Sequence, residues 1–138
     1  MTNSWIIDKS AYVRMPRAIE IDEWILRIGR GLVYVHPLTL LELGFSARNS
    51  ADWLQQMNRP PVTDLLIAEA TPSSFHRAQQ VQGVLAQRGY HRSASPVDLA
   101  IAATAELASL TVLHVDKDFD LIAGVTGQPM ERLKYNDS

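Results

Sequence analysis

The sequence predicts an α/β fold, an α/β/α sandwich in which helices cover both faces of a central parallel sheet. Short apolar runs rich in β-branched residues alternate with longer helical segments, and no linker, internal repeat or low-complexity tract interrupts them. Regular alternation of strands and helices favours parallel strands, because each crossover helix returns the chain to the same end of the sheet. At 138 residues, we expect one domain, residues 1–138, with a core that needs no disulfide.

The first part of the chain is predicted to form two strands around one helix. Trp5, Ile6 and Ile7 are a short apolar run, typical of a buried strand. A helix is predicted to open at Pro16, because apolar residues recur at helical spacing between residues 21 and 28, and to end at Gly29 and Gly31. Residues 32–36 then predict a strand, which Pro37 closes.

The rest of the chain continues the alternation. Helices are predicted after Pro37, over residues 51–57, from Thr71-Pro72 to just before Gly89, from Ser95-Pro96 onward and over residues 119–123. Strands are predicted over residues 111–115 and 130–133, and a short, ambiguous one over residues 65–68.

Four acids far apart in the sequence each adjoin an apolar run: Asp8, Glu42, Asp98 and Asp116. A carboxylate beside a hydrophobic core is costly unless a hydrogen bond, an opposite charge or a metal compensates it. Asp8 and Asp116 follow predicted strands, so both belong at the carboxyl edge of the sheet, where open α/β sheets bind ligands. The four acids together predict one shared cation.

Each acid also has a local explanation when it is taken alone. Asp98 stands three residues after Ser95, as a capping-box acid does, and Asp8 is placed to form a turn or a helix cap. Asp116 opens a charged segment that ends at Asp120, typical of a solvated loop. Glu42 is the exception, since no lysine or arginine lies three or four residues away from it.

Four segments of the chain, between residue 5 and about residue 125, resemble the PIN-domain ribonucleases, and most closely the VapC toxins of bacterial VapBC toxin–antitoxin modules. These segments are Asp8-Lys9-Ser10-Ala11, Leu40-Leu41-Glu42-Leu43, residues 96–105 from Pro96 through Asp98, and residues 114–119 from His114 through Asp116. The resemblance implies a PIN-like, Rossmann-like fold and a metal-dependent endoribonuclease. It also implies RNA products with a 5′-phosphate and a 3′-hydroxyl, from transfer RNA or ribosomal RNA.

The expected cofactor is Mg²⁺ or Mn²⁺, because hard cations prefer oxygen ligands. We expect Asp8, Asp98 and Asp116 to bind it directly or through water, and Glu42 to hold a second ion or a water. Asp118 is expected as an auxiliary ligand. Ser10 is expected to orient a ligand water or a phosphate through its hydroxyl. Its simpler interpretation is a helix N-cap, which is compatible with both roles.

The resemblance also implies partners, namely a cognate VapB-like antitoxin whose carboxyl-terminal segment lies across the active cleft, and a second copy of the chain in a homodimer. The amphipathic stretches 19–28 and 47–57 are candidate surfaces for either partner, or ordinary core-facing helices.

The chain departs from the family pattern at two places. Lys9 stands where the family commonly has threonine, and His114-Val115 replaces a Thr-Arg pair. The acids and Ser10 are retained, so the departures alter the polar surroundings of the site, and Lys9 could contact a phosphate or an acid.

Composition excludes several chemistries. The chain has no cysteine, which removes disulfides, thiolate zinc sites and cysteine nucleophiles. Its four histidines lack zinc-helix spacing, and no nucleophile elbow, P-loop or dinucleotide fingerprint occurs. No apolar run reaches membrane-spanning length and no signal peptide is seen, so a cytoplasmic protein is expected. The net charge is −2, but arginines outnumber lysines ten to three and could guide RNA.

Three other functions fit parts of the pattern. A Mg²⁺-dependent phosphoryl-transfer domain also places aspartates at strand ends, but Asp8-Lys9-Ser10 lacks the second acid that such sites use. A PIN nuclease for RNA processing or for DNA would share the site and have no antitoxin. A non-enzymatic interaction domain would require all four acids to be caps.

Overall fold

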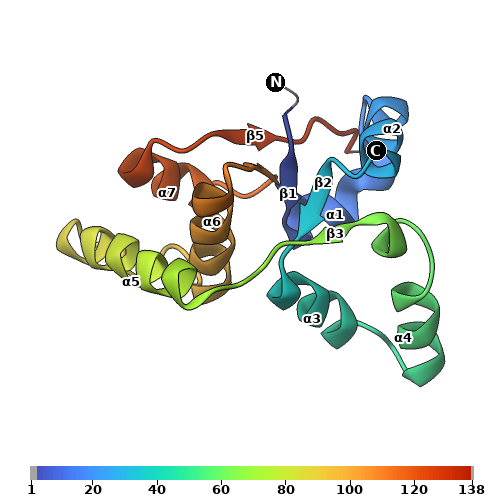
Figure 1. Ribbon diagram of the computed structural model, residues 1–138, viewed down its shortest axis with the longest axis horizontal. Helices are drawn as coiled ribbons and strands as arrows, with labels where there is room; N and C mark the ends of the chain where they lie inside the picture. Colours follow the sequence, from blue (N-terminus) through green and yellow to red (C-terminus); the bar gives the residue numbers. More distant parts are fainter. Residues whose placement is uncertain (1–2, 138) are drawn as a thin grey trace.

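A computed structural model describes residues 3–137 of the chain. Its five strands form one parallel sheet in the order β3-β2-β1-β4-β5 (Figure 1). The strands are β1 (Trp5–Ile7), β2 (Val33–Val35), β3 (Leu66–Ile67), β4 (Thr111–His114) and β5 (Met130–Arg132). The helices are α1 (Lys9–Arg14), α2 (Ile21–Gly29), α3 (Pro37–Phe45), α4 (Ser50–Met57), α5 (Pro72–Gln87), α6 (Pro96–Ala108) and α7 (Asp118–Thr126), with short 3₁₀ helices η1 (Met15–Arg17) and η2 (Val62–Asp64). The predicted α/β class and parallel sheet are confirmed.

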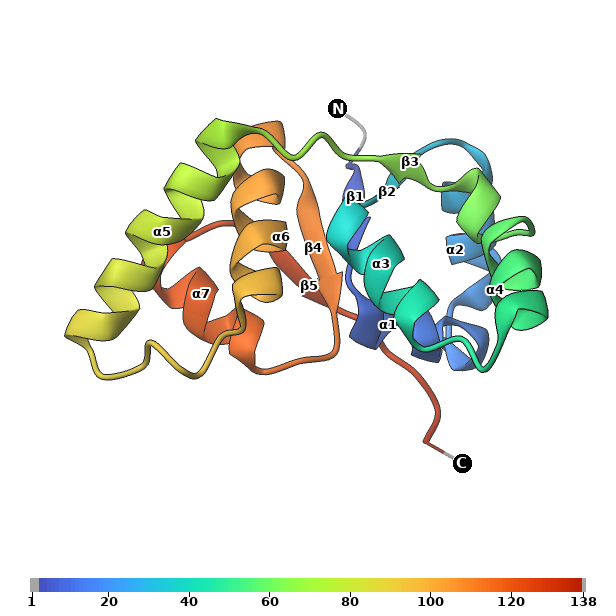
Figure 2. The same cartoon turned by 90° about the horizontal axis from the view of Figure 1, so that it is seen from below.

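Helices cover both faces of the sheet, as expected (Figure 2). On one face α5, α6 and α7 pack on Ile6 and Val112, and on the other α1 and α2 pack on Ile7 and Leu113. The two faces alternate along each strand because successive side chains of a strand point to opposite sides. Asp8 follows Ile7, so this alternation turns its side chain toward the face covered by α6.

Helix α6 occupies the centre of the molecule. All seven residues from Leu99 to Ala105 are buried, which confirms the expectation of a helix that is apolar on nearly every side. The helix starts where Ser95 caps it and Pro96 occupies its first turn. Burial on all sides fixes its position, and therefore the position of Asp98 in its first turn.

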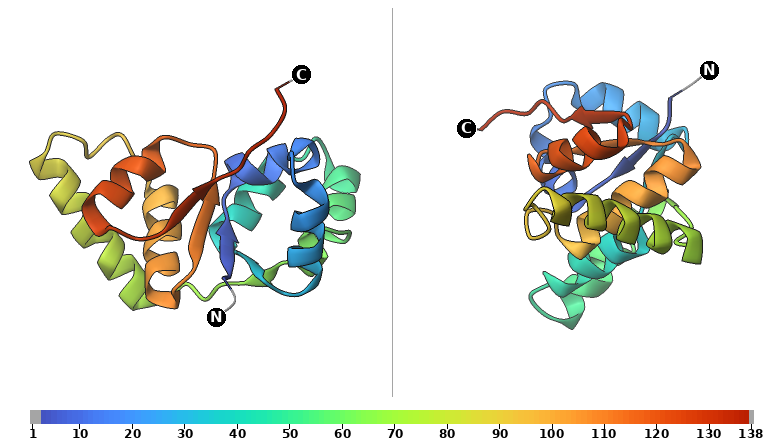
Figure 3. Two further views of the ribbon diagram at one scale, coloured as in Figure 1. Left: turned by 90° about the horizontal axis from the view of Figure 1, so that it is seen from above. Right: turned by 90° about the vertical axis from the view of Figure 1, so that its left-hand side faces the viewer.

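The prediction that a helix begins at Pro16 is wrong. The chain instead forms α1 directly after Asp8, a 3₁₀ turn at Met15–Arg17, and α2 only from Ile21. The extended residue Ala18 separates them, pairing in an antiparallel bridge with Tyr135, while the Ile19 N–H donates to the Lys134 carbonyl over 2.9 Å. Figure 3 shows the chain after β5 running past these helices. This pairing with a distant segment breaks the helix that local periodicity favours.

None of the helices described between residues 3 and 137 is long and apolar enough to cross a membrane.

Candidate metal centre

The carboxyl edges of β1 and β4 bring two of the predicted acids to one place. Asp8 comes directly after β1, and Asp116 comes two residues after the end of β4. The strands are parallel neighbours with Ile7 opposite Leu113, and the Asp8 N–H donates to the Leu113 carbonyl over 3.1 Å. From β1 the chain proceeds to β2 and β3 on one side, then returns to β4 and β5 on the other. The acids thus lie where the strand order reverses, the usual ligand-binding point of such sheets.

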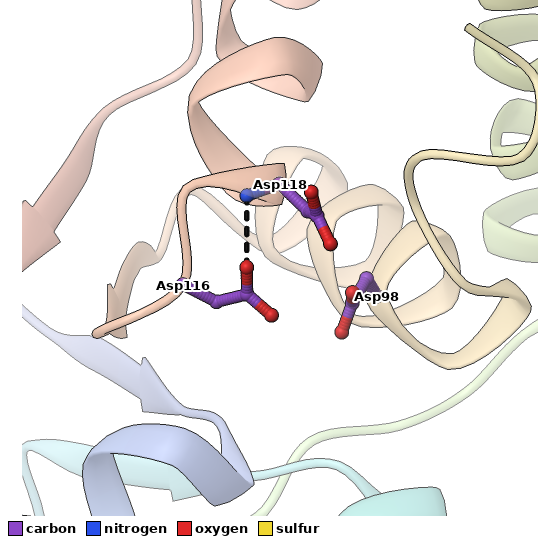
Figure 4. Close-up of side chains that lie close together, drawn as sticks. All are labelled: Asp98, Asp116 and Asp118. Atoms are coloured by element: carbon purple, nitrogen blue, oxygen red, sulfur yellow. Dashed lines mark hydrogen bonds between the residues drawn. The ribbon is translucent and has the colours of Figure 1, made fainter.

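Three aspartates converge at this edge (Figure 4). Asp98, Asp116 and Asp118 each place a carboxylate oxygen within 4.8 Å of those of the other two. The Asp116 Oδ1 accepts a hydrogen bond from the Asp118 N–H over 2.9 Å, which ties the start of α7 to the loop after β4. Ser95 accepts from the Asp98 N–H over 3.1 Å and thereby anchors that residue at the start of α6.

Asp8 lies beside these three aspartates, but it does not belong to the group whose carboxylate oxygens lie within 4.8 Å of one another. Its side chain is 4% exposed and caps α1, accepting from the Ala11 N–H over 3.0 Å. The Ser10 hydroxyl lies 2.7 Å from Asp8 Oδ1 and accepts from the Val115 N–H over 2.9 Å. The N-cap is therefore Asp8, and Ser10 connects Asp8 to the loop after β4.

Glu42 is the most peripheral of the predicted site residues. It projects from α3, is partly buried, and lies outside the aspartate trio. Burial raises the pKa of its carboxyl, the Lys9 ammonium lowers it, and the charge of Asp8 raises it. Glu42 is thus close enough to Asp8 for their charges to interact. Lys9 itself donates to the Ser46 hydroxyl over 2.8 Å, near the end of the same helix.

The acids raise one another's proton affinity. Burial, and then the charge of Asp116, raises the pKa of Asp98 to about 6, with a smaller contribution from Asp8 and partial relief from hydrogen bonding with Ser95. Burial also raises the pKa of Asp118, and Asp116 adds to the effect. Like charges held in a partly desolvated site disfavour ionisation unless a cation balances them. The trio therefore carries negative charge that its surroundings offset only in part, through Lys117.

Two buried histidines, His36 and His114, flank Asp8. The sequence analysis placed His114 in the surroundings of the site but gave neither histidine a role. Ile7 pairs with Val35 and with Leu113, so His36 and His114 follow on either side of Asp8. Each accepts at Nδ1 from the backbone N–H two residues later, of Leu38 over 3.0 Å and of Asp116 over 3.1 Å. Their shared position at a strand's carboxyl end was the signal that could have revealed them.

The donor chemistry fits a hard divalent cation. The convergent groups are carboxylates, there is no cysteine, and the Nδ1 atoms of His36 and His114 are already engaged by backbone N–H groups. Oxygen-only sites suit Mg²⁺ and Mn²⁺, whereas zinc favours nitrogen and sulfur. Burial and the charge of Asp116 raise the pKa of Asp98, and a bound cation would lower it again.

Comparison with known proteins agrees with this geometry. Residues 6–125 match the model of the PIN domain family. The chain is 50% identical over 131 residues to Ribonuclease VapC2 of Mycobacterium tuberculosis, covering 95% of this chain and 93% of the relative. It is 46% identical over 101 residues to Ribonuclease VapC51 of the same species, covering 73% and 72%.

Solved structures share the fold at low sequence identity. A DNA-bound VapBC complex from Salmonella typhimurium contains a chain that aligns with a TM-score of 0.75 at 18% identity, covering 95% of this chain and 98% of that one. VapBC2 from Rickettsia felis aligns with a TM-score of 0.78 at 14% identity, covering 94% and 98%. The family match, the relatives and the acidic edge agree, and the chain belongs to the PIN-domain family and, within it, to the VapC ribonucleases.

Proposed function

We propose that this chain is the toxin of a type II toxin–antitoxin pair and cleaves RNA internally with Mg²⁺ or Mn²⁺. The observation that carries the proposal is the convergence of Asp98, Asp116 and Asp118 within 4.8 Å beside buried Asp8, in a chain of the VapC family. Transfer RNA and ribosomal RNA are the candidate substrates.

In this proposal each acidic side chain has a role in binding the cation or its water. Asp98 and Asp116 hold the cation, Asp8 binds it directly or through a water, and Asp118 is an auxiliary ligand. A bound divalent ion supplies a water of lowered pKa and offsets charge on the scissile phosphate. Glu42 orients a water or holds a second ion at the outer side of the cluster. Ser10 keeps Asp8 in place through its hydroxyl, supported by its bonds to Asp8 and the Val115 N–H.

Total cellular RNA provides the direct test. The purified protein is incubated with it in Mg²⁺, in Mn²⁺ and in chelator, and new 5′ ends are mapped by sequencing. We expect cuts at one or a few sites that require the metal and disappear in Asp98→Asn. Asp22→Asn, which changes an exposed acid on α2, is the matched control and should cut as the wild type does. Equal cleavage patterns in wild type and Asp98→Asn would remove the catalytic role of the cluster.

An antitoxin segment has a suitable place next to this site. A mainly apolar groove of about 800 Å³ runs between α1, α2 and the segment from Gln56 to Asp64. Ile25, which is 58% exposed, lines it, as does Tyr12, whose N–H bonds the Asp8 carbonyl over 3.0 Å. Tyr12 stands one helical turn after Asp8 on α1, so the groove begins close to the end of β1. We propose that a VapB-like antitoxin occupies this groove and binds there to residues 19–28 of this chain, one of the two candidate partner surfaces named above.

A homodimer belongs to the same proposal. The edge strand β3 leaves Leu66 and Ile67 43% and 61% exposed, and Phe75 and Leu107 on the adjoining helices are 48% and 55% exposed. Exposed apolar edges of this kind are typical of interaction surfaces. Light scattering of wild type and Ile67→Lys should give a dimer and a monomer respectively.

The main competing function is a PIN nuclease that has no antitoxin. Both functions share the metal site, so cleavage assays do not separate them. A small neighbouring gene whose product binds the groove and stops cleavage favours the toxin, and a nuclease that no such product inhibits favours the alternative.

A further inference from the structure

A second hollow adjoins the aspartate cluster on the side away from β1. It has a volume of about 450 Å³ and lies between the loop after α5 and the start of α7. Its lining residues are Tyr90, Ser93, Lys117, Asp118, Asp120 and Leu121. Asp118 belongs both to this hollow and to the cluster. A molecule in the hollow would therefore be the immediate neighbour of a group bound at the metal centre.

Tyr90 presents an aromatic ring at this hollow while its backbone is held in place. The Tyr90 N–H donates to the Leu85 carbonyl over 2.7 Å, and the Tyr90 carbonyl accepts from the Ser93 N–H over 3.1 Å. Gly89 precedes it with a φ of +78°, a conformation that turns the chain away from the end of α5. The side chain is 47% exposed. Exposed aromatic rings are the platforms on which proteins stack unpaired bases.

The surroundings of the hollow carry cations available to a phosphate. Lys117 lines the hollow, and Arg88 and Arg92, which stand two residues before and after Tyr90 in the sequence, are exposed. Among the described residues 3–137, the arginines held in ion pairs are Arg27, Arg48 and Arg77, none of which is in this loop. Lys117 also stands between Asp116 and Asp118, so its ammonium offsets negative charge that would otherwise repel RNA. Aromatic and basic groups together favour single-stranded nucleic acid.

We propose that this hollow is a nucleotide subsite, in which the base beside the scissile phosphate stacks on Tyr90 and the adjoining phosphate contacts Lys117. The subsite takes an unpaired nucleotide of single-stranded or looped RNA, because a base within a duplex has no free face to stack. The inference rests on the proposed ribonuclease function and specifies how its substrate is held. The apolar groove beside α2 has no such cations among its lining residues apart from Arg59, and we assign it to the antitoxin.

The test uses a short single-stranded RNA that spans the mapped cleavage site. Tyr90→Ala should raise KM about tenfold with kcat little changed, the size expected for losing one base–aromatic stack. Tyr90→Phe keeps the ring and should behave as the wild type does. Phe45→Ala is the matched control, since Phe45 is 91% exposed at the end of α3 and lies outside the hollow. Lys117→Ala should make the slope of log kcat/KM against the logarithm of salt concentration less steep by about one unit, the change expected when one phosphate contact is lost.

Binding measured without cleavage separates this inference from the function on which it rests. Fluorescence anisotropy of the same RNA is recorded on Asp98→Asn, with and without Tyr90→Ala, and we expect about tenfold weaker binding in the double variant. If the wild type cuts RNA but Tyr90→Ala leaves both KM and binding unchanged, the subsite is overturned and the ribonuclease stands. If the wild type cuts no RNA, binding is measured with an unstructured RNA oligonucleotide of mixed sequence. Binding that depends on Tyr90 then keeps the subsite, and the nuclease proposal fails. Absence of both cleavage and binding overturns both.

Discussion

The Ser10 hydroxyl links Asp8 to the loop that carries Asp116. It lies 2.7 Å from Asp8 Oδ1 and 2.9 Å from Oδ2, and accepts from the Val115 N–H over 2.9 Å. One small side chain thus joins the ends of β1 and β4. Since these strands supply acids to the same cluster, the separation of Asp8 from Asp116 depends on this contact.

Ser10→Ala should impair cleavage more than it impairs folding. The variant leaves the partly buried Val115 N–H without its acceptor and removes one hydrogen bond to Asp8, at a cost of about 1–2 kcal/mol in the free energy of unfolding. We expect kcat/KM to fall by about 10- to 100-fold, the range found for residues that orient metal ligands. Ser10→Thr retains a hydroxyl and should recover most of the activity. Equal metal affinity in Ser10→Ala and wild type, measured by calorimetry, would contradict this role.

The ionisation of Asp98 should lower the stability of the metal-free protein as pH rises from about 4 to 7. Burial and Asp116 raise the pKa of Asp98 to about 6, above its unfolded value of roughly 3.9. Between these values the folded state binds more protons than the unfolded state, so unfolding becomes easier with rising pH. Asp98→Asn cannot ionise and should flatten this dependence and raise the melting temperature at pH 7. Chemical denaturation at several pH values in chelator measures it; identical slopes for wild type and variant would refute it.

Mg²⁺ or Mn²⁺ should stabilise the wild type and act much less on Asp98→Asn. A ligand that binds only the folded state adds about 2.7 kcal/mol at one hundred times its Kd. Bound metal should also abolish the loss of stability that the ionisation of Asp98 causes with rising pH, because the metal balances the charges of the carboxylates. Thermal scans at increasing metal concentration measure both effects. A monovalent salt at matched ionic strength is the control, and equal shifts with both salts would argue for screening alone.

Two neighbouring apolar residues of α2 should contribute differently to antitoxin binding. Ile25 and Leu26 are 58% and 52% exposed on the same helix, but only Ile25 lines the groove. Ile25→Glu places a charge in an apolar surface and should weaken antitoxin binding about 100-fold or more while leaving RNA cleavage intact. Leu26→Glu should bind as the wild type does. Each variant is titrated with the candidate antitoxin, and binding is measured as inhibition of RNA cleavage. Equal inhibition of both variants would show that the antitoxin does not bind in this groove.

Local sequence was sufficient for most elements of the fold. The strands at Trp5–Ile7 and Thr111–His114 and the helices beginning at Pro37, Pro72 and Pro96 form where predicted, since apolar runs and prolines act over a few residues. The helix α1 was missed because its six residues are too few to show a helical period. It forms because Asp8 caps it at the end of a strand.

The sequence by itself determined which residues are acidic, that each adjoins the core, and that Asp8 and Asp116 follow strands. Only the tertiary structure decided that Asp98, Asp116 and Asp118 form the tight trio, with Asp8 beside them and Glu42 further out. It also placed His36 and His114 on either side of Asp8, and Tyr90 beside Asp118. The physical reason is that these neighbours come from distant segments. Their spacing depends on strand order and on the packing of α6 against the sheet, which no short stretch of sequence encodes.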